Sequence, residues 1–417
     1  MKKLNAYKVY LFEEFAASLF FTMMFTVNLV YQVQVAHLNP LQLVLVGTVL
    51  EATAFVFEIP TGVVADVYSR RLSVIFSFFL IGASFILQTA PVFEIILVGS
   101  VVGGIGWTFM SGALEAWVAG EMGEKNAGAA YLRAAQIGSI GAFFGIIAGV
   151  ALGSITLALP MLLAGTLTVT LGIFLTITMP ENGFAPTPRE NRNSFQHMLY
   201  TFRNGVRLVR LRPVLITILI IGAIYGAFSE GYDRLWTAHL LENFTLPTLG
   251  SLQPIVWFGI INGAGLLLNA AATEIVRRRV DTNSHSRVAS ALLTINSLLI
   301  VGILAFALAG NFALALVTLL AVKPLRGMNA PLATAWANQS LEPSVRATVF
   351  SMQSQADALG QIIGGPILGA LATAFTLRAG LVGAGLILLP ALFLLAVFSF
   401  GARRSAHAPR SYSRLSS

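Results

Sequence analysis

Residues 62–71 read GVVADVYSRR and form the densest charged break in the first half of the chain. Long apolar runs lie on both sides of this stretch. Asp66 precedes Arg70 and Arg71 by four and five residues, and Gly62 precedes Asp66 by one helical turn. A glycine at that position lets a neighbouring backbone approach closely. The stretch therefore reads as a short charged connection between two apolar helices.

Composition places most of the chain in a lipid bilayer. Of its 417 residues, 56% are hydrophobic and only 11% are charged, whereas a soluble protein of this size needs far more charged surface. The net charge of +8 comes from basic residues in short breaks between apolar runs, a pattern of membrane orientation rather than nucleic-acid binding. There is no cysteine, so disulfides and thiolate metal sites are excluded. We expect no metal, no cofactor and no nucleic acid.

Twelve apolar runs are long enough to cross about 30 Å of hydrocarbon as helices. Most breaks between them are short, so neighbouring helices run antiparallel. The sequence predicts an all-α membrane protein of two six-helix halves. The runs cover 7–36, 40–66, 70–90, 92–120, 127–153 and 157–180, then 213–242, 253–278, 287–309, 311–340, 346–374 and 377–401.

The one long break, 181–212, contains two prolines and then a basic, amphipathic stretch from Ser194 to Arg212. We expect that stretch to lie along the membrane surface. The predicted units are an N-terminal bundle (1–180), a cytoplasmic linker (181–212), a C-terminal bundle (213–402) and a cytoplasmic tail (403–417).

The distribution of basic residues predicts the orientation. With the N-terminus inside, the cytoplasmic segments hold nearly all Lys and Arg, and the outer loops hold Arg378 alone. The first run follows a basic N-terminus but carries Glu13 and Glu14, so we expect a retained span rather than a signal peptide. The prediction is a monomeric multi-pass protein of the cell membrane with both termini in the cytoplasm.

The 62–71 stretch resembles the cytoplasmic loop signature of the major facilitator superfamily, Gly-x-x-x-Asp-x-x-Gly-Arg-Arg, between the second and third membrane helices. Ser69 replaces the second glycine. Twelve spans without extra domains, and Glu-Ile-Pro-Thr-Gly at 58–62, look most similar to bacterial tetracycline and macrolide efflux proteins. The matching residues are Gly62, Asp66, Arg70 and Arg71.

The resemblance implies a proton-driven exporter of amphipathic or cationic drugs that works by alternating access. Helices 1, 4, 7 and 10 would line the cavity, and helices 2, 5, 8 and 11 would join the halves. Related drug–proton antiporters usually carry an arginine in a motif on helix 4, and residues 96–106 contain none. Coupling then uses other residues, or the protein is not a proton antiporter.

The second half repeats the charged break, because Glu274 and the arginines after it follow the eighth run as Asp66 follows the second. We expect Asp66 near the start of the eleventh helix, where the helix dipole favours a carboxylate. Glu274 is expected near the start of the fifth helix, close to Arg133. These contacts would hold the outward-open state. The predicted gate comprises Gly62, Asp66, Arg70, Arg71, Arg133 and Glu274.

Glycines recur every four residues in the fifth run, and a similar series occupies the eleventh. Small residues at this spacing let helices pack closely in lipid. Repeats of this kind in transporters place the substrate near the bilayer midplane, between the halves. The fifth-run glycines, which we interpret as packing residues, are Gly141, Gly145, Gly149 and Gly153.

Ionisable groups inside the spans differ between the halves. Glu51, Glu58 and Glu115 have no comparably deep Lys or Arg in the first half, whereas the second half carries both signs. Unpaired carboxylates in a membrane suit proton uptake and release. The plainer alternative is that they face water or polar side chains. The second-half charges are Glu230, Asp233 and Asp357 with Arg234, Lys323 and Arg326.

Helical spacing predicts which of these side chains work. In the seventh run, Glu230 and Arg234 are placed to pair along the helix, which leaves Asp233 as the possible working acid. The predicted coupling residues are Glu115 first, then Asp233, Glu58 and Glu51. The fourth-run residues Trp107, Ser111 and Glu115 share one face, as do Tyr225, Ser229, Tyr232 and Trp236 in the seventh.

Lys323 and Arg326 flank Pro324, where a broken helix would expose both to the cavity. They either bind an anionic substrate or neutralise the carboxylates of the seventh run, and we favour the second. The predicted cavity residues are Asn28, Tyr31, Gln32, Trp107, Ser111, Tyr225, Tyr232, Trp236, Lys323 and Arg326.

Two alternatives stay open beside drug export. A transporter of an anionic metabolite would use Lys323 and Arg326 as its substrate clamp. A membrane receptor that no longer transports would not need so many intramembrane charges. An enzyme is not expected, since the chain shows no nucleophile–base set, phosphate loop or metal-ligand spacing.

Single introduced cysteines test the predicted topology cleanly, because the chain has none of its own. Cysteines near Leu38, Thr245 and Leu377 should react with an impermeant thiol reagent added outside intact cells. Cysteines near Ser69, Asn191 and Thr282 should not react. Labelling of position 191 from outside would overturn the orientation.

Overall fold

The computed structural model describes residues 5–185, 213–250, 252–341 and 346–397. Within them the regular structure is α-helical, apart from one isolated bridge between Leu249 and Leu252. The first half holds α1 (Ala6–Gln34), α2 (Pro40–Val67), α3 (Arg70–Leu87), α4 (Phe93–Met110), α5 (Ala113–Met122), α6 (Glu124–Gly153) and α7 (Ala158–Thr178). The second half holds α9 (Pro213–Asn243), α10 (Ile255–Arg279), α11 (His285–Ala307), α12 (Phe312–Ser340), α13 (Arg346–Ala374) and α14 (Leu377–Ile387).

Eleven helical segments of the described chain are long and apolar enough to cross a membrane. The pair α4 and α5 counts as one of them, Phe93–Met122, and the last extends α14 to Val397. The predicted eleventh run forms α13 but is too polar to count. Because α13 packs between α9 and α2, its Asp357 and Gln361 need not face lipid. The predicted all-α membrane fold is confirmed.

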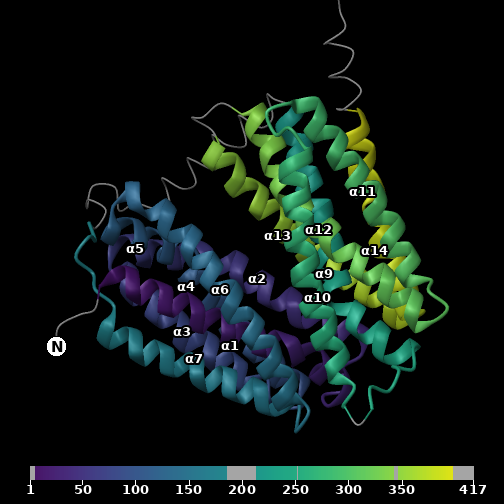
Figure 1. Cartoon of the computed structure of the whole chain (residues 1–417), viewed down its shortest axis with the longest axis horizontal. Coiled ribbons are helices and arrows are strands. Elements are labelled where there is room, and N and C mark those ends of the chain that lie inside the picture. Colours follow the sequence, from purple (N-terminus) through teal and green to yellow (C-terminus); the bar gives the residue numbers. More distant parts are fainter. Residues whose placement is uncertain (1–4, 186–212, 251, 342–345, 398–417) are drawn as a thin grey trace, which may run out of the picture.

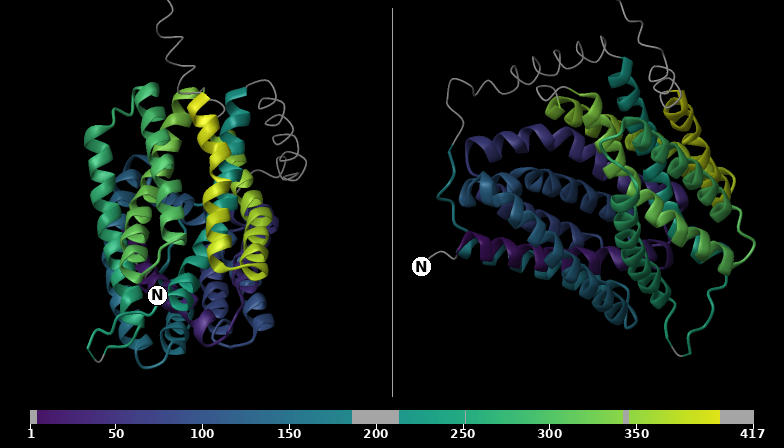
Figure 2. Two further views of the ribbon diagram at one scale, coloured as in Figure 1. Left: turned by 90° about the vertical axis from the view of Figure 1, so that its right-hand side faces the viewer. Right: turned by 45° about the horizontal axis from the view of Figure 1, so that its top comes forward.

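The helices form two groups, drawn purple to teal and green to yellow in Figures 1 and 2. In the first, α1 packs along α6 and α3 along α4 and α7; in the second, α9 packs along α13 and α11 along α12. The groups meet mainly where α2 contacts α13 and α9, and where α6 contacts α10. The predicted boundaries stay a prediction, because 186–212, with its amphipathic stretch, and 398–417 lie outside the described residues.

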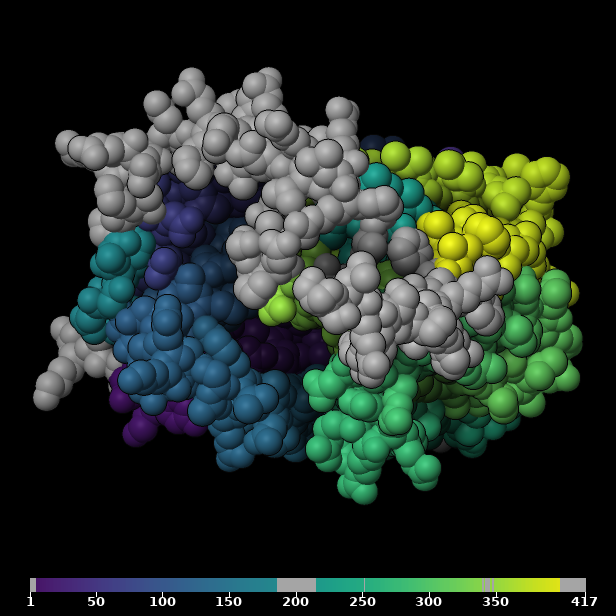
Figure 3. Space-filling model, turned by 90° about the horizontal axis from the view of Figure 1, so that it is seen from above, coloured from purple at the N-terminus to yellow at the C-terminus, as the bar shows by residue number. Residues whose placement is uncertain are grey.

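The two groups meet at one end and diverge at the other (Figure 1). Where they meet, a Cβ on Gly259 of α10 would lie 2.3 Å from Val150 of α6. At a separate contact between the groups, the amide of Leu41 in α2 donates to the Thr373 hydroxyl of α13 (2.9 Å). We call the end where the groups meet the closed end and the opposite one the open end. From the open end a hollow is visible between the groups, with purple α1 at its floor (Figure 3).

The 62–71 stretch lies at the open end, and its residues Ser69, Arg70 and Arg71 form hydrogen bonds with other residues of the first group. Ser69 caps α3: its hydroxyl accepts a hydrogen bond from the backbone of that helix (2.9 Å) and donates to Glu181 (2.7 Å). Arg70 and Arg71 donate to backbone carbonyls of α5 and α7. A side chain that caps a helix and anchors the segment after α7 accounts for serine in place of glycine.

The predicted contact between Glu274 and Arg133 is not formed in this conformation. Glu274 accepts from Arg277 on its own helix (2.7 Å), and Arg133 donates to Gln136 on its own helix (3.0 Å). A Cβ on Gly62 would meet nothing within 4 Å, so the expected close backbone approach is absent here. The gate belongs to a conformation shut at the open end, and it stays a prediction.

The fifth-run glycines pack against α1, as predicted. A Cβ on Gly141 would lie 2.4 Å from the carbonyl oxygen of Phe15, and one on Gly145 would lie 2.5 Å from that of Leu19. Such distances fall inside van der Waals contact, so only glycine fits while the two backbones stay this close.

Replacing Gly141 with alanine should destabilise the protein by about 1–3 kcal/mol, because the methyl group overpacks the α1–α6 contact. Thermal unfolding in detergent measures the loss. Gly128→Ala on the same helix is the matched control, since a Cβ there would meet nothing within 4 Å. Equal unfolding temperatures for both variants would contradict the packing assignment.

Candidate functional site

A central cavity of about 430 Å³ lies between the two groups. It is lined from α1 and α2 on one side and from α9, α10, α12 and α13 on the other. Its apolar wall includes Phe25, Leu29, Val30, Trp236 and Phe258. Its polar and charged lining includes Asn28, Glu51, Glu230, Asp233, Arg234, Asn262, Lys323 and Gln361. A mixed lining of this kind suits a small amphipathic molecule.

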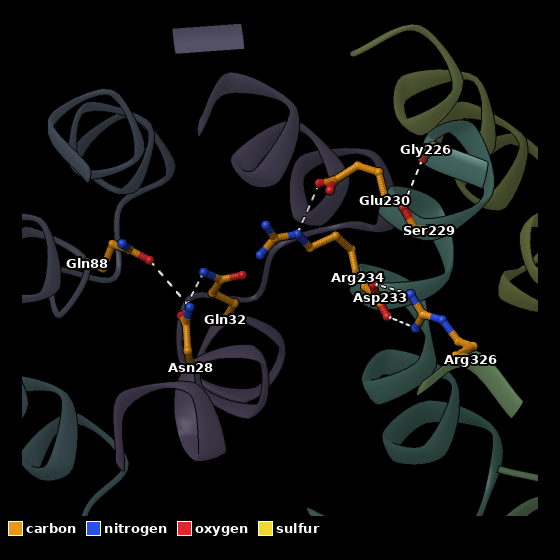
Figure 4. Close-up of polar contacts among 9 residues, drawn as sticks. All are labelled: Asn28, Gln32, Gln88, Gly226, Ser229, Glu230, Asp233, Arg234 and Arg326. Atoms are coloured by element: carbon orange, nitrogen blue, oxygen red, sulfur yellow. Dashed lines mark hydrogen bonds and ion pairs between the residues drawn. The ribbon is translucent and has the colours of Figure 1, made fainter. Parts of the chain in front are cut away.

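Two ion pairs order the second-half side of the cavity (Figure 4). Glu230 and Arg234 pair along α9 at 3.1 Å, as predicted. Asp233, also on α9, accepts two hydrogen bonds from the Arg326 guanidinium of α12, one of them at 2.8 Å. This fork joins α9 to α12 and neutralises Asp233. Arg326 therefore has the neutralising role that we favoured.

Lys323 differs from its neighbour Arg326. Its ammonium lies 3.4 Å from the Asn262 side-chain oxygen and 5.0 Å from the centre of the Trp236 ring. In the part of the chain that the structure describes, no carboxylate lies within ion-pair distance of it. Lys323 is thus a cation on the cavity wall without a carboxylate partner there.

Glu51 of α2 lies between two cavities. It lines the central one and also a second cavity of about 370 Å³, which is lined mainly by α9, α12 and α13. That second cavity contains Asp357, which accepts a hydrogen bond from Gln361 (2.8 Å). Among the described residues, Glu51 forms no ion pair. It is the cavity carboxylate of the first half, and Lys323 faces the same space.

The amides of α1 form a buried chain in the first half. Gln32 donates to Asn28 (2.8 Å), and Asn28 donates to Gln88 (3.5 Å). Tyr31 is buried and donates to the Thr89 carbonyl. Of the three α1 residues predicted for the cavity, Asn28 lines it, whereas Tyr31 and Gln32 lie behind its wall.

The aromatic stripe of α9 is divided between cavity and core. Trp236 lines the central cavity and Tyr225 the second one. Tyr232 is buried at 2% exposure against Phe228 and Phe306, and Ser229 lines neither cavity. Of the charged residues of α9, Glu230 and Arg234 lie against Gly47 of α2 in the other half, whereas Asp233 pairs with Arg326 in its own half.

The predicted face shared by Trp107, Ser111 and Glu115 does not exist. The helix breaks after Met110, where Gly112 adopts a left-handed conformation (φ 70°), so Trp107 lies on α4, Ser111 in the break and Glu115 on α5. Trp107 packs on a phenylalanine of α1, and Ser111 donates to Glu58 (3.0 Å). None of these four residues lines either cavity.

Glu115 is exposed in this conformation, which contradicts our expectation that it is buried without a partner. It lies in the first turn of α5, after the break. Its backbone carbonyl accepts a hydrogen bond from the Tyr131 hydroxyl (2.8 Å). The role of Glu115 in proton coupling stays a prediction, but it is not supported by the exposure of this side chain, because the role was expected to depend on burial.

Two acids in α1 were not among the predicted site residues. Glu13 is 3% exposed, and one of its carboxylate oxygens has no hydrogen-bond partner. Glu14 is half-buried and accepts from Ser18 (3.5 Å). Two adjacent acids inside the first apolar run were the available signal, which we read only as marking a retained span.

Comparisons with known proteins agree with this architecture. The chain is 24% identical over 363 residues to an uncharacterised MFS-type transporter, YxaM, of Bacillus subtilis (strain 168), which covers 85% of this chain and 86% of the relative. Its fold is similar to that of the peptide transporter POT in complex with sulfate (TM-score 0.73, 15% identity, 96% of this chain and 94% of the other). The nucleoside transporter NupG is also similar (TM-score 0.72, 14% identity, 97% and 100%).

A third solved structure is a POT family transporter in complex with 5-aminolevulinic acid (TM-score 0.70, 17% identity, 95% and 96% covered). At these identities the solved structures show the fold alone. The family model of the Major Facilitator Superfamily matches residues 14–323, more than half of the chain. The chain therefore belongs to the major facilitator superfamily, and it is a multi-pass membrane protein that works as a secondary transporter rather than an enzyme.

Proposed function

We propose that this transporter couples proton movement to the transport of a small, amphipathic, positively charged molecule, with export as its direction. The observation that supports the proposal is that three glutamates of the first half have no ion-pair partner in the described chain. Glu13, Glu51 and Glu115 form no ion pair within the described residues. Direction rests on the resemblance of the 62–71 stretch and its surroundings to drug efflux proteins.

Glu51 is the coupling residue that the geometry favours. Coupling needs a carboxylate whose surroundings change between the two conformations, since only such a group binds a proton on one side and releases it on the other. Glu51 is half-buried between two cavities. Glu115 is already exposed in this conformation, and Asp233 is bonded to Arg326. Both are less suited.

The substrate class follows from the cavity lining. Phe25, Trp236 and Phe258 offer apolar and aromatic surface to a flat or greasy molecule. Both second-half pairs cancel internally, so Glu51 balances Lys323 in the central cavity, and Asp357 adds one further acid in the second cavity. A cation thus finds a carboxylate in the cavity, and protonation of that carboxylate weakens its hold.

A second candidate is an anionic or zwitterionic substrate, and Lys323 favours it. An ammonium on the cavity wall with no carboxylate partner in the described chain can bind a substrate carboxylate. A zwitterion would use Glu51 for its positive end and Lys323 for its negative end. The fold similarity to a transporter solved with 5-aminolevulinic acid, itself a zwitterion, is compatible with this reading.

Glu51→Gln should abolish uphill export of ethidium driven by a pH gradient in proteoliposomes, while some downhill exchange survives, because the amide cannot carry a proton. Glu115→Gln should lose less. Normal uphill export by Glu51→Gln with loss in Glu115→Gln would return the coupling role to Glu115. The absence of any pH-driven movement in the wild type would reject proton coupling itself.

Lys323→Gln separates the two substrate classes. If the substrate is a cation, the variant should bind ethidium at least as tightly as the wild type, because a repulsive charge is gone. If the substrate is instead an anion or a zwitterion, small carboxylates should compete with ethidium for binding to the wild type. They should no longer compete in the Lys323→Gln variant. Lys125→Gln, at an exposed position outside the cavity, is the control.

A further inference from the structure

The Glu230–Arg234 pair is more than an internal neutralisation of α9, because it occupies the space above a glycine of the other half. A Cβ on Gly47 of α2 would lie 1.7 Å from a carboxylate oxygen of Glu230 and 2.4 Å from Nε of Arg234. The paired side chains therefore rest directly on the α2 backbone. No other residue at position 47 leaves that space free.

A second glycine borders Glu230 from α13. A Cβ on Gly365 would lie 2.8 Å from Cγ of Glu230 and 3.1 Å from the Thr48 hydroxyl oxygen of α2. Glu230 is 4% exposed, so it is enclosed where α2, α9 and α13 converge. The hydrogen bond from Leu41 to Thr373 joins α2 and α13 further toward the closed end.

Arg234 extends from this place toward α1. Figure 4 shows its guanidinium directed at Gln32, whose side-chain oxygen is buried and has no hydrogen-bond partner. Gln32 is itself fully buried. The ion pair of one half thus contacts α2 of the other half and faces α1, and it does so on the side where the halves are shut.

An ion pair contained within one helix has a specific advantage at a contact that must open and close. A salt bridge between the halves would leave two unpaired charges each time they separate, and unpaired charge in a membrane is costly. Glu230 and Arg234 leave their position on Gly47 as a neutral unit. Separation of the halves removes only van der Waals contacts between the ion pair and α2, and these contacts form again when the halves close.

We propose that the Glu230–Arg234 pair, seated on Gly47 and Gly365, is a latch that positions the two halves at the closed end during alternating access. Gly47 and Gly365 leave a space because they have no side chain, and the Glu230–Arg234 pair fills that space without adding net charge. We call the paired side chains the plug. The latch requires no change in the charge of either residue, although both also line the central cavity.

The test uses distances between spin labels, because the chain has no cysteine of its own. Labels at Ile155 and Phe375, both exposed and on opposite halves at the closed end, report the opening of that end. In Gly47→Val, the ratio of molecules with a short distance between the two labels to molecules with a long distance should fall at least tenfold, because the valine side chain occupies the space of the ion pair. Gly263→Val is the matched control, since a Cβ there would meet nothing within 4 Å, and its ratio should stay within twofold of wild type.

Two further variants keep the proposal falsifiable if Gly47→Val folds poorly. The double variant Glu230→Ala, Arg234→Ala removes the plug without overpacking and should also lower the ratio several-fold. Adding Gly47→Val to that double variant should restore part of the short-distance population, because the valine fills the vacated space. Ratios within twofold of wild type for both Gly47→Val and the double alanine variant would overturn the latch.

Discussion

The cost of placing charge in a hydrocarbon environment organises this transporter. Each ionisable side chain within the bilayer must be paired, hydrated or protonated. The second half meets this requirement with two pairs that share one helix, Glu230 with Arg234 and Asp233 with Arg326. The Arg326 guanidinium also lies 5.2 Å from the ring centres of Phe228 and Tyr232. Its charge is therefore stabilised by the Asp233 carboxylate and by two aromatic rings. The two pairs form a neutral part of the second-half side of the cavity, and Lys323 adds a positive charge beside them.

The first half meets the same requirement differently. Glu13, Glu51 and Glu115 form no ion pair within the described residues. They lie at graded depths, from the exposed Glu115 to the buried Glu13. An acid without a cation stays in a membrane by contacting water or by taking a proton. The two halves therefore differ chemically. The second half holds two fixed ion pairs together with Asp357 and Lys323, whereas Glu13, Glu51 and Glu115 of the first half have no ion-pair partner in the described chain.

Glycine spacing determines how closely the helices approach. Between α1 and α6 it brings two backbones together within one half, and between α2 and α13 it brings the halves together at the closed end. Lipid offers no hydrophobic gain for helix association, so such close contacts contribute most of the packing free energy. Contacts that rely on fit can separate without leaving unpaired charge, which suits a protein whose halves alternate between two arrangements.

The sequence by itself determined the helical class, the number of apolar runs and the internal pairing of Glu230 with Arg234. These follow from hydropathy and from the four-residue spacing along one helix, both of which are local properties. Tertiary structure alone decided which face of α9 meets the cavity, that Asp233 binds Arg326, and that Lys323 is left without a carboxylate partner in the described chain. It also broke the fourth run at Gly112 and exposed Glu115. Those outcomes depend on which helix packs against which, and contacts between residues distant in sequence have no periodic signature along the chain.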